Sequence, residues 1–215
     1  RIVNSIPNGP TATIEPVGKV SVGDYVWVDS NHDGRQDATE QGIPGVVLKI
    51  TGPGGQSVTD VNGNPVGPQT TNGDGLYSFD NLPILQDGQH YTVTIDQDAD
   101  STKTALAPYV PTIAGQGDRA GDSSTWTASS EGLTEDGQRD PTLDFGFVNK
   151  SYAVGDYVWV DANRNGVQDN GEVALSGVTV TLLDGDGKAV GTTTTDKDGR
   201  YLFDNLPAGT YQAQF

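Results

Sequence analysis

The chain carries Val22-Gly23-Asp24-Tyr25-Val26-Trp27-Val28-Asp29 near its start, and it carries the same eight residues again as Val154–Asp161. Bulky side chains stand on both faces of this alternating pattern, as in a strand that is covered on both sides. The match continues to Gly45-Val46, which recurs as Gly177-Val178. We therefore predict two copies of one structural unit.

The copies differ where loops are expected. Residues 79–83 (Phe-Asp-Asn-Leu-Pro) recur as residues 203–207, at a shorter spacing than the first match, because the first copy has an insertion between Thr51 and Thr71. Surface loops tolerate such changes in length. We predict a linker or the end of a preceding domain at residues 1–18, one repeat at 19–149, and a second repeat at 151–215 that lacks the counterpart of residues 96–148.

Short alternating segments rich in Val, Thr and Tyr are separated by Gly, Pro and Asp, and no apolar period of 3.6 extends far enough for a helix of normal length. The fold class predicted is all-β, with tandem antiparallel β-sandwich domains. The expected strands are residues 22–29, 45–51, 76–80, 91–95 and 142–148 in the first copy, and residues 154–161, 177–183, 188–194, 200–204 and 210–215 in the second.

The charge of the chain excludes some partners. It has 29 acidic and 12 basic residues, a formal net charge of −17, and no cysteine. Such an excess of negative charge repels nucleic acid and anionic membranes, so we expect neither as a partner and no membrane insertion of this segment. Without cysteine there are no disulfides and no thiolate metal sites. Bound cations would relieve the repulsion between the clustered acids.

A twelve-residue segment with the pattern of a calcium loop follows the opening strand of each copy. Oxygen-bearing side chains occupy positions one, three, five and nine, glycine the sixth and glutamate the twelfth, while the seventh residue offers its backbone carbonyl. The predicted ligands of the first loop are Asp29, Asn31, Asp33, Arg35, Asp37 and Glu40. Those of the second loop are Asp161, Asn163, Asn165, Val167, Asp169 and Glu172. Because the second loop has one carboxylate fewer than the first, we predict that it binds calcium slightly more weakly.

Asp, Asn and Gly are also common in turns, but composition alone does not explain a twelve-position spacing that occurs twice. Other acids give weaker signals, and each has an alternative interpretation. Asp74, Asp196 and Asp198 are further candidate ligands or ordinary hairpin-turn residues. Asp118 and Asp122 belong to an acidic region that is either an ion site or a solvated face. Asp24 and Asp156 either point to a nearby ion or cap a backbone kink beside glycine.

These motifs together resemble the B repeats of serine–aspartate-repeat bacterial surface proteins, relatives of the collagen-adhesin B-type domain. The resemblance rests on the opening strand, the calcium loops, Gly177–Leu182, Thr194–Tyr201, Asn205–Tyr211 and Asp144–Phe147. It implies a Cna-B or transthyretin-like sandwich with calcium loops between its strands, several Ca²⁺ ions per repeat, and a stalk that projects an adhesive domain from the cell wall.

Some relatives of this kind carry a lysine–asparagine isopeptide bond between their first and last strands. Here the pair would be Lys19 with Asn149 or Asp144. The counterpart of Lys19 in the second copy is Ser151, and Lys150 is one residue out of register, so it would face the opposite side of the strand. We therefore expect no such bond.

The predicted function is a calcium-stabilised spacer of a secreted or wall-anchored bacterial surface protein, and its expected partners are neighbouring repeats of the same chain. The short junction at residues 149–151 favours a stiff rod. An adhesin module that binds a host protein or glycan through its loops, above all the 52–71 insertion, is the alternative. Neither His32 nor His90 has an evident catalytic partner, so we expect no enzyme. Head-to-tail assembly, with residues 11–15 of one molecule adding a strand to the second repeat of another, is a further hypothesis.

Overall fold

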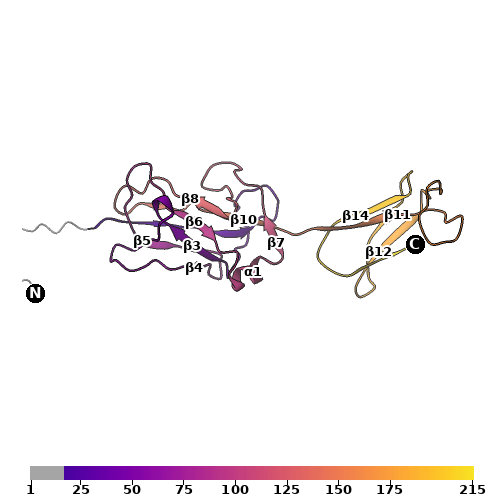
Figure 1. Ribbon diagram of the computed structural model, residues 1–215, viewed down its shortest axis with the longest axis horizontal. Helices are drawn as coiled ribbons and strands as arrows, with labels where there is room; N and C mark the ends of the chain where they lie inside the picture. The colour runs from indigo at the N-terminus through magenta and orange to yellow at the C-terminus, as the bar shows by residue number, and fades with distance from the viewer. Residues whose placement is uncertain (1–16) are drawn as a thin grey trace, which may run out of the picture. The chain divides into compact units, whose positions relative to one another are not determined.

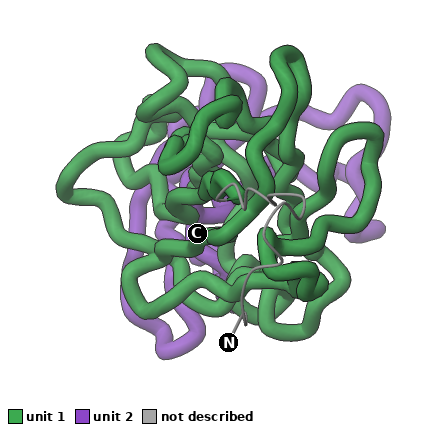
Figure 2. Tube along the Cα trace, turned by 90° about the vertical axis from the view of Figure 1, so that its left-hand side faces the viewer, with its two compact units in different colours: residues 1–148 green, residues 149–215 purple. Residues whose placement is uncertain are grey.

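A computed structural model describes residues 17–215, which divide into two compact units (Figures 1 and 2). Unit 1 ends at Val148, and unit 2 runs from Asn149 to Phe215. The predicted linker at residues 1–18 and the predicted donor strand at residues 11–15 lie wholly or almost wholly outside the described residues. Among these residues, no helix has both the length and the apolar character needed to cross a membrane.

Unit 1 is built from three small sheets around one core. Their strand orders are β5-β1-β9, β2-β10-β7 and β4-β3-β6-β8. One seven-residue helix, α1 (Asp100–Leu106), and a short 3₁₀ turn (Pro53–Gly55) interrupt the strands. The strands are β1 (Lys19–Val22), β2 (Val26–Val28), β3 (Val47–Thr51), β4 (Gln69–Thr70), β5 (Phe79–Pro83), β6 (Thr92–Ile95), β7 (Tyr109–Pro111), β8 (Thr127–Ser129), β9 (Arg139–Asp140) and β10 (Phe145–Asn149).

The opening strand of unit 1 is broken, which corrects the prediction of one strand over residues 22–29. β1 belongs to one sheet and β2 to another, with the break at residues 23–25. A Cβ atom on Gly23 would lie 2.5 Å from the carbonyl oxygen of Tyr77, so the chain passes close to β5 at this point. Both faces of the segment at residues 22–29 are covered because the chain leaves the sheet of β1 and enters the sheet of β2.

The sheets are mostly antiparallel, as predicted, but they include two parallel strand pairs that the sequence does not predict. β1 pairs with β9, and β2 pairs with β10, in parallel register. In both pairs the chain leaves the opening segment and returns to it after more than a hundred residues, and a connection of this length allows a parallel return. The pairs β1–β5, β3–β4, β3–β6 and β6–β8 are antiparallel.

The core of unit 1 lies between the four-stranded sheet and the remaining strands. Leu48 and Val93 from the four-stranded sheet belong to the same buried cluster as Val22, Phe79 and Phe145. Trp27 is also completely buried. Burial of these apolar side chains holds the strand ends, and thus the loops, in place.

Unit 2 repeats part of this arrangement. Its strands form two sheets, β11-β14 and β13-β12-β15. They are β11 (Tyr152–Tyr157), β12 (Thr179–Asp184), β13 (Ala189–Thr194), β14 (Arg200–Leu206) and β15 (Tyr211–Gln214). The pairs β11–β14, β12–β13 and β12–β15 are antiparallel. Its buried apolar cluster contains Val180, Leu182 and Phe203, with half-buried neighbours such as Tyr201. This core is much smaller than that of unit 1.

Candidate functional site

The first candidate calcium loop begins at Asp29, directly after β2. This side chain is completely buried. Its carboxylate accepts hydrogen bonds from the backbone N–H groups of Asp33 (3.2 Å) and Gly34 (2.9 Å) and from the hydroxyl of Thr112. The first side chain of the loop therefore draws the sixth residue back towards the strand end.

Glu40, at the twelfth position, closes the same loop. Its Oε1 accepts a hydrogen bond from the backbone N–H of Ser30 (2.8 Å), and its Oε2 accepts one from that of Asp37 (3.0 Å). The residue is almost completely buried. Both ends of the loop are thus held by carboxylates that turn inwards.

The oxygens of the middle of the loop face an amide group. The Nδ2 atom of Asn31 lies 3.1 Å from Asp33 Oδ2 and 2.9 Å from Asp37 Oδ2. This side-chain N–H₂ group donates to both carboxylates. It places the third side chain of the loop within hydrogen-bond distance of the fifth and the ninth.

A segment far along the sequence supports the first loop. Gly34 has a φ angle of 75°, and a Cβ atom there would lie 2.5 Å from the carbonyl oxygen of Ile113. The N–H of Gln36 donates to the carbonyl of Gly121 at 2.8 Å. Residues 112–122 therefore brace the loop. Sequence reasoning missed Thr112, because nothing in its local sequence indicates a contact with Asp29.

The second loop, residues 161–172, repeats these hydrogen bonds. Asp161 accepts from the N–H groups of Asn165 (3.2 Å) and Gly166 (2.9 Å). Glu172 accepts from those of Ala162 (2.9 Å) and Asp169 (3.0 Å). Two amide side chains, Asn163 and Asn165, donate to Asp169 Oδ2 at 2.6 and 2.7 Å. These bonds lower the pKa of Asp169, that from Asn163 contributing most.

The surroundings of the two loops differ. Asp161 and Glu172 are half-buried, whereas their counterparts Asp29 and Glu40 are buried. A Cβ atom on Gly166 would meet no atom within 4 Å. Within the described part of unit 2, no segment takes the place of residues 112–122. The second loop thus has the internal hydrogen bonds of the first, and the described residues show no outer contact like that of Thr112.

The loops fit calcium in the kind and order of their donors, because Ca²⁺ takes six to eight hard oxygens and uses positions one, three, five, seven, nine and twelve of such a loop. The seventh residues, Arg35 and Val167, offer only backbone carbonyls for this purpose. Across residues 17–215, however, no three or more His, Cys, Asp or Glu side chains are grouped so as to hold a metal ion. Instead, N–H groups satisfy the loop carboxylates, and a cation would have to compete with them.

A second acidic region lies near the break in the opening strand. Asp24 Oδ1 lies 3.6 Å from Nη2 of the Arg139 guanidinium, and burial is the largest influence that raises the pKa of Asp24. The pKa of Asp122 is also raised, chiefly by burial. The backbone of Asp122 forms a bridge to Arg35, and the carbonyl of Asp118 accepts from the N–H of Asp122 at 3.0 Å. In unit 2, Asp156 is exposed on β11.

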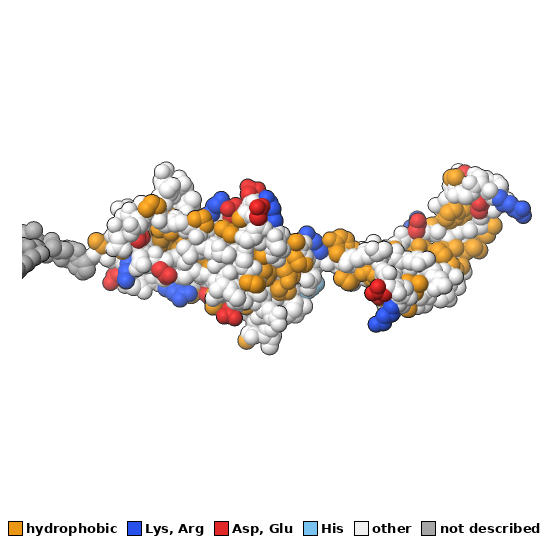
Figure 3. Space-filling view, turned by 90° about the horizontal axis from the view of Figure 1, so that it is seen from below, with side chains coloured by type: hydrophobic (Ala, Val, Ile, Leu, Met, Phe, Trp, Pro, Cys, Tyr) orange, Lys and Arg blue, Asp and Glu red, His pale blue; other side chains and the backbone are white. Residues whose placement is uncertain are grey.

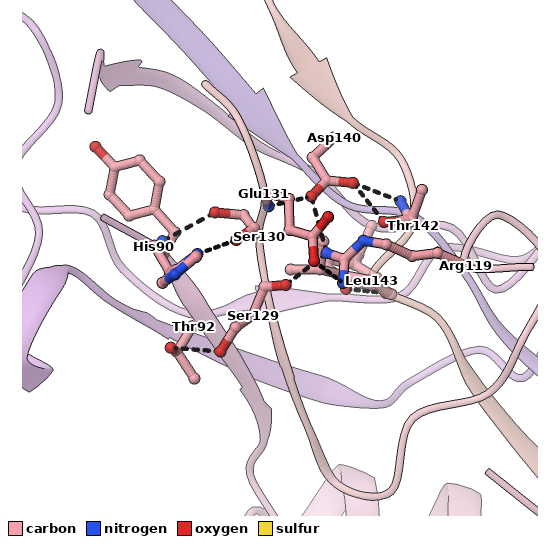
Figure 4. A network of polar contacts seen from close by, with 11 residues as sticks. His90, Thr92, Arg119, Ser129, Ser130, Glu131, Asp140, Thr142 and Leu143 are labelled. Atoms are coloured by element: carbon pink, nitrogen blue, oxygen red, sulfur yellow. Dashed lines mark hydrogen bonds and ion pairs between the residues drawn. The ribbon is translucent and has the colours of Figure 1, made fainter. Parts of the chain in front are cut away.

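Asp140, in the same region, is buried in a polar network that accounts for its charge (Figure 4). Its Oδ2 accepts from Arg119 (3.1 Å) and from the N–H of Glu131 (2.8 Å), and its Oδ1 accepts from the hydroxyl of Thr142 (2.5 Å). Arg119 also donates to the carbonyl of Ser129 at 2.5 Å. The network ties β9 to the loop that follows β8.

Asp144, just before β10, is the least compensated acid in the described residues. It is 1% exposed, its Oδ1 accepts from the N–H of Tyr25 at 3.1 Å, and its Oδ2 is buried without a hydrogen-bond partner. Burial, followed by the negative charge of Asp24, raises its pKa to about 8. The side chain is therefore largely protonated at neutral pH.

The acids before β5 and β14 lie in turns. Asn72 Oδ1 accepts from the N–H groups of Asp74 and Leu76, both at 2.9 Å. In unit 2, Asp196 takes the place of Asn72 and accepts from Asp198 N–H (2.8 Å) and Arg200 N–H (2.9 Å). These bonds, that from Arg200 first, lower the pKa of Asp196. The turn geometry accounts for these residues without an ion.

Among the described contacts, the side chain of Lys19 has none with Asn149 or Asp144, the two residues considered as isopeptide partners. Its Nζ lies 3.5 Å from Asn81 Oδ1, while Asp144 is bonded to the Tyr25 amide.

The insertion of the first copy is folded, with Val58 buried in the core and Asp60 Oδ1 accepting from the N–H groups of Asn62 and Asn64, each at 2.8 Å.

Comparison with known proteins identifies relatives along nearly the whole chain. The serine-aspartate repeat-containing protein D of Staphylococcus aureus (strain Newman) is 40% identical over 197 residues, which cover 92% of this chain and 13% of that protein. The serine-aspartate repeat-containing protein F of Staphylococcus epidermidis (strain ATCC 12228) is 40% identical over 200 residues, or 91% of this chain and 11% of that protein. The chain thus spans about one eighth of the length of these relatives.

A solved structure, that of the Bacillus anthracis TIE protein, matches the fold with a TM-score of 0.50 and 19% identity, over 93% of this chain and 28% of the other. The family model described as the SdrD B-like domain matches residues 20–147 and 152–215. These two matched ranges correspond to the two copies of the repeat, and the chain belongs to the SdrD B-like domain family.

Proposed function

We propose that these two repeats are a calcium-stabilised spacer in a bacterial surface protein. The observation that carries the proposal is the duplicated loop: both copies close it with the same carboxylate-to-amide hydrogen bonds at its first and twelfth residues. Membership of the SdrD B-like domain family supports a structural role. The loop chemistry supports calcium binding, and likeness to the serine-aspartate repeat-containing proteins supports a spacer role.

The residues that would hold Ca²⁺ are oxygen donors of the two loops. They are Asp29, Asn31, Asp33, Asp37, Glu40 and the carbonyl of Arg35 in unit 1, and Asp161, Asn163, Asn165, Asp169, Glu172 and the carbonyl of Val167 in unit 2. Bound Ca²⁺ supplies positive charge where several carboxylates meet. Because the native loop binds and the unfolded chain does not, calcium at about a hundred times its dissociation constant would add roughly 2.7 kcal/mol per site to the free energy of unfolding.

The second acidic region is a further candidate for cations. The charges of Asp24 and Asp122 both raise the pKa of Asp144, whose Oδ2 is buried without a hydrogen-bond partner. A cation there would offset the repulsion among these acids. Asp118, Asp74, Asp156, Asp196 and Asp198 have weaker support, and the last two are bonded within a turn.

A structural role accounts better than catalysis for the two histidines. His32 is exposed within the first loop with a φ angle of 63°, and His90 Nδ1 contacts the backbone carbonyl of Ser130 at 2.5 Å.

We place the protein outside the cell, at the bacterial surface or wall, with neighbouring repeats as its first partners. The 52–71 insertion remains the place where a host ligand would be sought, although its buried Val58 serves the core.

The proposal is tested by removing one charge from each loop. Glu40→Gln and Glu172→Gln keep an oxygen that accepts from the Ser30 or Ala162 amide but lose a carboxylate that calcium would use. Each variant is expected to show a smaller rise in melting temperature on calcium addition than the parent chain. Glu135→Gln, which changes an exposed acid outside both loops, is the matched control and should respond fully. An equal calcium response in all four proteins would refute the proposal.

A further inference from the structure

The second loop contains an Asn-Gly step, Asn170-Gly171, where the first loop has Ala38-Thr39. An asparagine before glycine loses its side-chain amide most readily, because glycine has no Cβ atom to hinder its backbone nitrogen from reaching the side-chain carbonyl carbon. Residues 17–215 contain three more such steps, Asn62-Gly63, Asn72-Gly73 and Asn165-Gly166. The sequence alone does not rank the four steps, but their hydrogen bonds do.

The step Asn165-Gly166, in the same loop, has hydrogen bonds on both of the groups that would react. The Nδ2 atom of Asn165 donates to Asp169 Oδ2 at 2.7 Å, and its Oδ1 accepts from the N–H of Val167 at 2.7 Å. The N–H of Gly166 donates to Asp161 Oδ2 at 2.9 Å. The side-chain amide and the nitrogen that would attack it are thus both engaged, so these bonds have to break before the reaction.

The two steps in unit 1 are also restrained. Asn72 Oδ1 accepts from two backbone N–H groups of its own turn, each at 2.9 Å. At the other step, the N–H of Gly63 donates to the carbonyl of Asp60 at 2.9 Å, and Nδ2 of Asn62 lies 3.5 Å from Asp60 Oδ2. In each case a local hydrogen bond fixes the amide or the attacking nitrogen.

The step Asn170-Gly171 has none of these restraints. Within the part of the chain that the structure describes, no hydrogen bond engages the side-chain amide of Asn170 or the N–H of Gly171. Both residues are exposed in a turn, and a Cβ atom on Gly171 would meet nothing within 4 Å. The backbone is therefore free to rotate until the nitrogen of Gly171 reaches Cγ of Asn170.

The exposure of this turn is common to both repeats. In unit 1, where residues 112–122 contact the loop, Ala38 and Thr39 are exposed as well, although the first and twelfth residues of that loop are buried. The same backbone hydrogen bond, from the N–H of the twelfth residue to the carbonyl of the ninth, closes the turn at 3.0 Å in unit 1 and at 3.2 Å in unit 2. The tenth and eleventh positions thus face solvent even in the braced loop.

We propose that Asn170 is a site of spontaneous deamidation. The backbone nitrogen of Gly171 forms a bond to Cγ of Asn170, the bond from Cγ to Nδ2 breaks, and the displaced nitrogen leaves as ammonia with the proton of the Gly171 N–H. The product is a five-membered succinimide ring. Water then opens either of the two carbonyl–nitrogen bonds of the ring, which gives aspartate or isoaspartate at this position. The reaction consumes one water molecule and needs no enzyme or cofactor.

The isoaspartyl product alters the loop that contains it. Its main chain passes through the former side chain, so one methylene group is added between the ninth and twelfth positions. Two hydrogen bonds span this interval, from Glu172 N–H to Asp169 O (3.2 Å) and from Asp169 N–H to Glu172 Oε2 (3.0 Å), and the longer chain weakens them. Weaker calcium binding by the second loop should follow, a consequence that rests on the proposed function.

Both products also add a negative charge to the chain. The formal net charge is already −17, and Figure 3 shows acidic side chains exposed on both units. The new carboxylate therefore increases a repulsion that is already present. The change of charge, together with the small gain in mass, makes the product measurable by ion exchange and by mass spectrometry.

The test incubates the full chain in calcium-free buffer at mildly alkaline pH and follows the four steps by peptide mapping, with fragmentation that separates aspartate from isoaspartate. Asn170 is expected to react at least about fivefold faster than Asn62, Asn72 or Asn165, because each hydrogen bond that must open first contributes a factor of about this size. In urea, the four rates should converge. Asn170→Gln is the matched control: it keeps a primary amide that cannot close the same five-membered ring, so no product should form at this position.

Two results would overturn the proposal. One is a rate at Asn170 equal to that at Asn165 in the folded chain. The other is an intact Asn170 in the folded chain after the chain in urea has reacted completely. A chain that deamidates at Asn170 while its melting temperature does not respond to calcium would uphold the proposal and contradict the proposed function, so the two can be told apart.

Discussion

Asp29 shows how the hydrogen bonds of a single side chain stabilise the loop. Its carboxylate is completely buried, yet it has donors from its own loop and from Thr112, 83 positions away. A buried carboxylate needs such partners, because an uncompensated charge in a protein interior is costly. Asp161 has the same local donors and no counterpart of Thr112 in the described part of unit 2.

Thr112→Val tests this remote contact. The substitution preserves shape and removes the hydroxyl, so unit 1 should lose about 2 kcal/mol in its free energy of unfolding, the usual contribution of a hydrogen bond to a charged group. Calcium affinity of the first loop should change, while that of the second loop stays constant. Thr104→Val, at an exposed hydroxyl on α1, is the control. Equal effects of the two substitutions in urea titrations would contradict this role.

Asp144→Asn tests the buried acid. The pKa of Asp144 is raised from 3.8 to about 8, so between these values the folded chain holds a proton that the unfolded chain releases. In calcium-free buffer, unit 1 should therefore lose stability as the pH rises from about 4 to about 8, and no further above that range. The variant lacks this titration and should gain on the parent chain by on the order of a few kcal/mol across that interval. Parallel pH profiles of urea unfolding would show that Asp144 does not titrate in this way.

At the scale of elements, the repeat predicted much of the structure. Segments such as 47–51, 92–95 and 179–184 are strands close to where alternation placed them, and the glycine at the sixth loop position adopts the left-handed conformation in both copies. The break between β1 and β2 was missed, because alternation reports which faces are covered and not which sheet covers them. The parallel pairing of β2 with β10 depends on a return over a long connection, which has no local signal.

The contacts that residues 112–122 make with the first loop could not be predicted from the sequence either. Alanine substitutions at two equivalent glycines, Gly34 and Gly166, measure how much these contacts stabilise the loop. Gly34 and Gly166 have φ angles of 75° and 77°, so alanine causes similar backbone strain at both, on the order of 1 kcal/mol. Only at position 34 would the new Cβ meet a neighbour, the carbonyl oxygen of Ile113. Gly34→Ala should therefore weaken calcium binding by its own loop more than Gly166→Ala does. Similar losses, measured by calcium titration of each variant, would show that residues 112–122 do not brace the loop.

At the scale of the whole molecule, both units have the same electrostatic problem, which is clustered negative charge. The chain has a formal net charge of −17, and much of its acid is concentrated in the two loops and in the region of Asp24, Asp122 and Asp144. Repulsion within these groups opposes folding, and cations bound to the folded state would reverse that effect. In the first loop Asn31 donates to both Asp33 and Asp37, and in the second loop Asn163 and Asn165 both donate to Asp169.

Thermal melting during a calcium titration, with the bound ions counted at each step, tests the central claim most directly. The account predicts at least two Ca²⁺ ions per chain, a melting temperature that rises as they bind, and a return to the lower value when a chelator is added. A melting temperature that is the same with calcium and with chelator, or a chain that binds no calcium while fully folded, would contradict it.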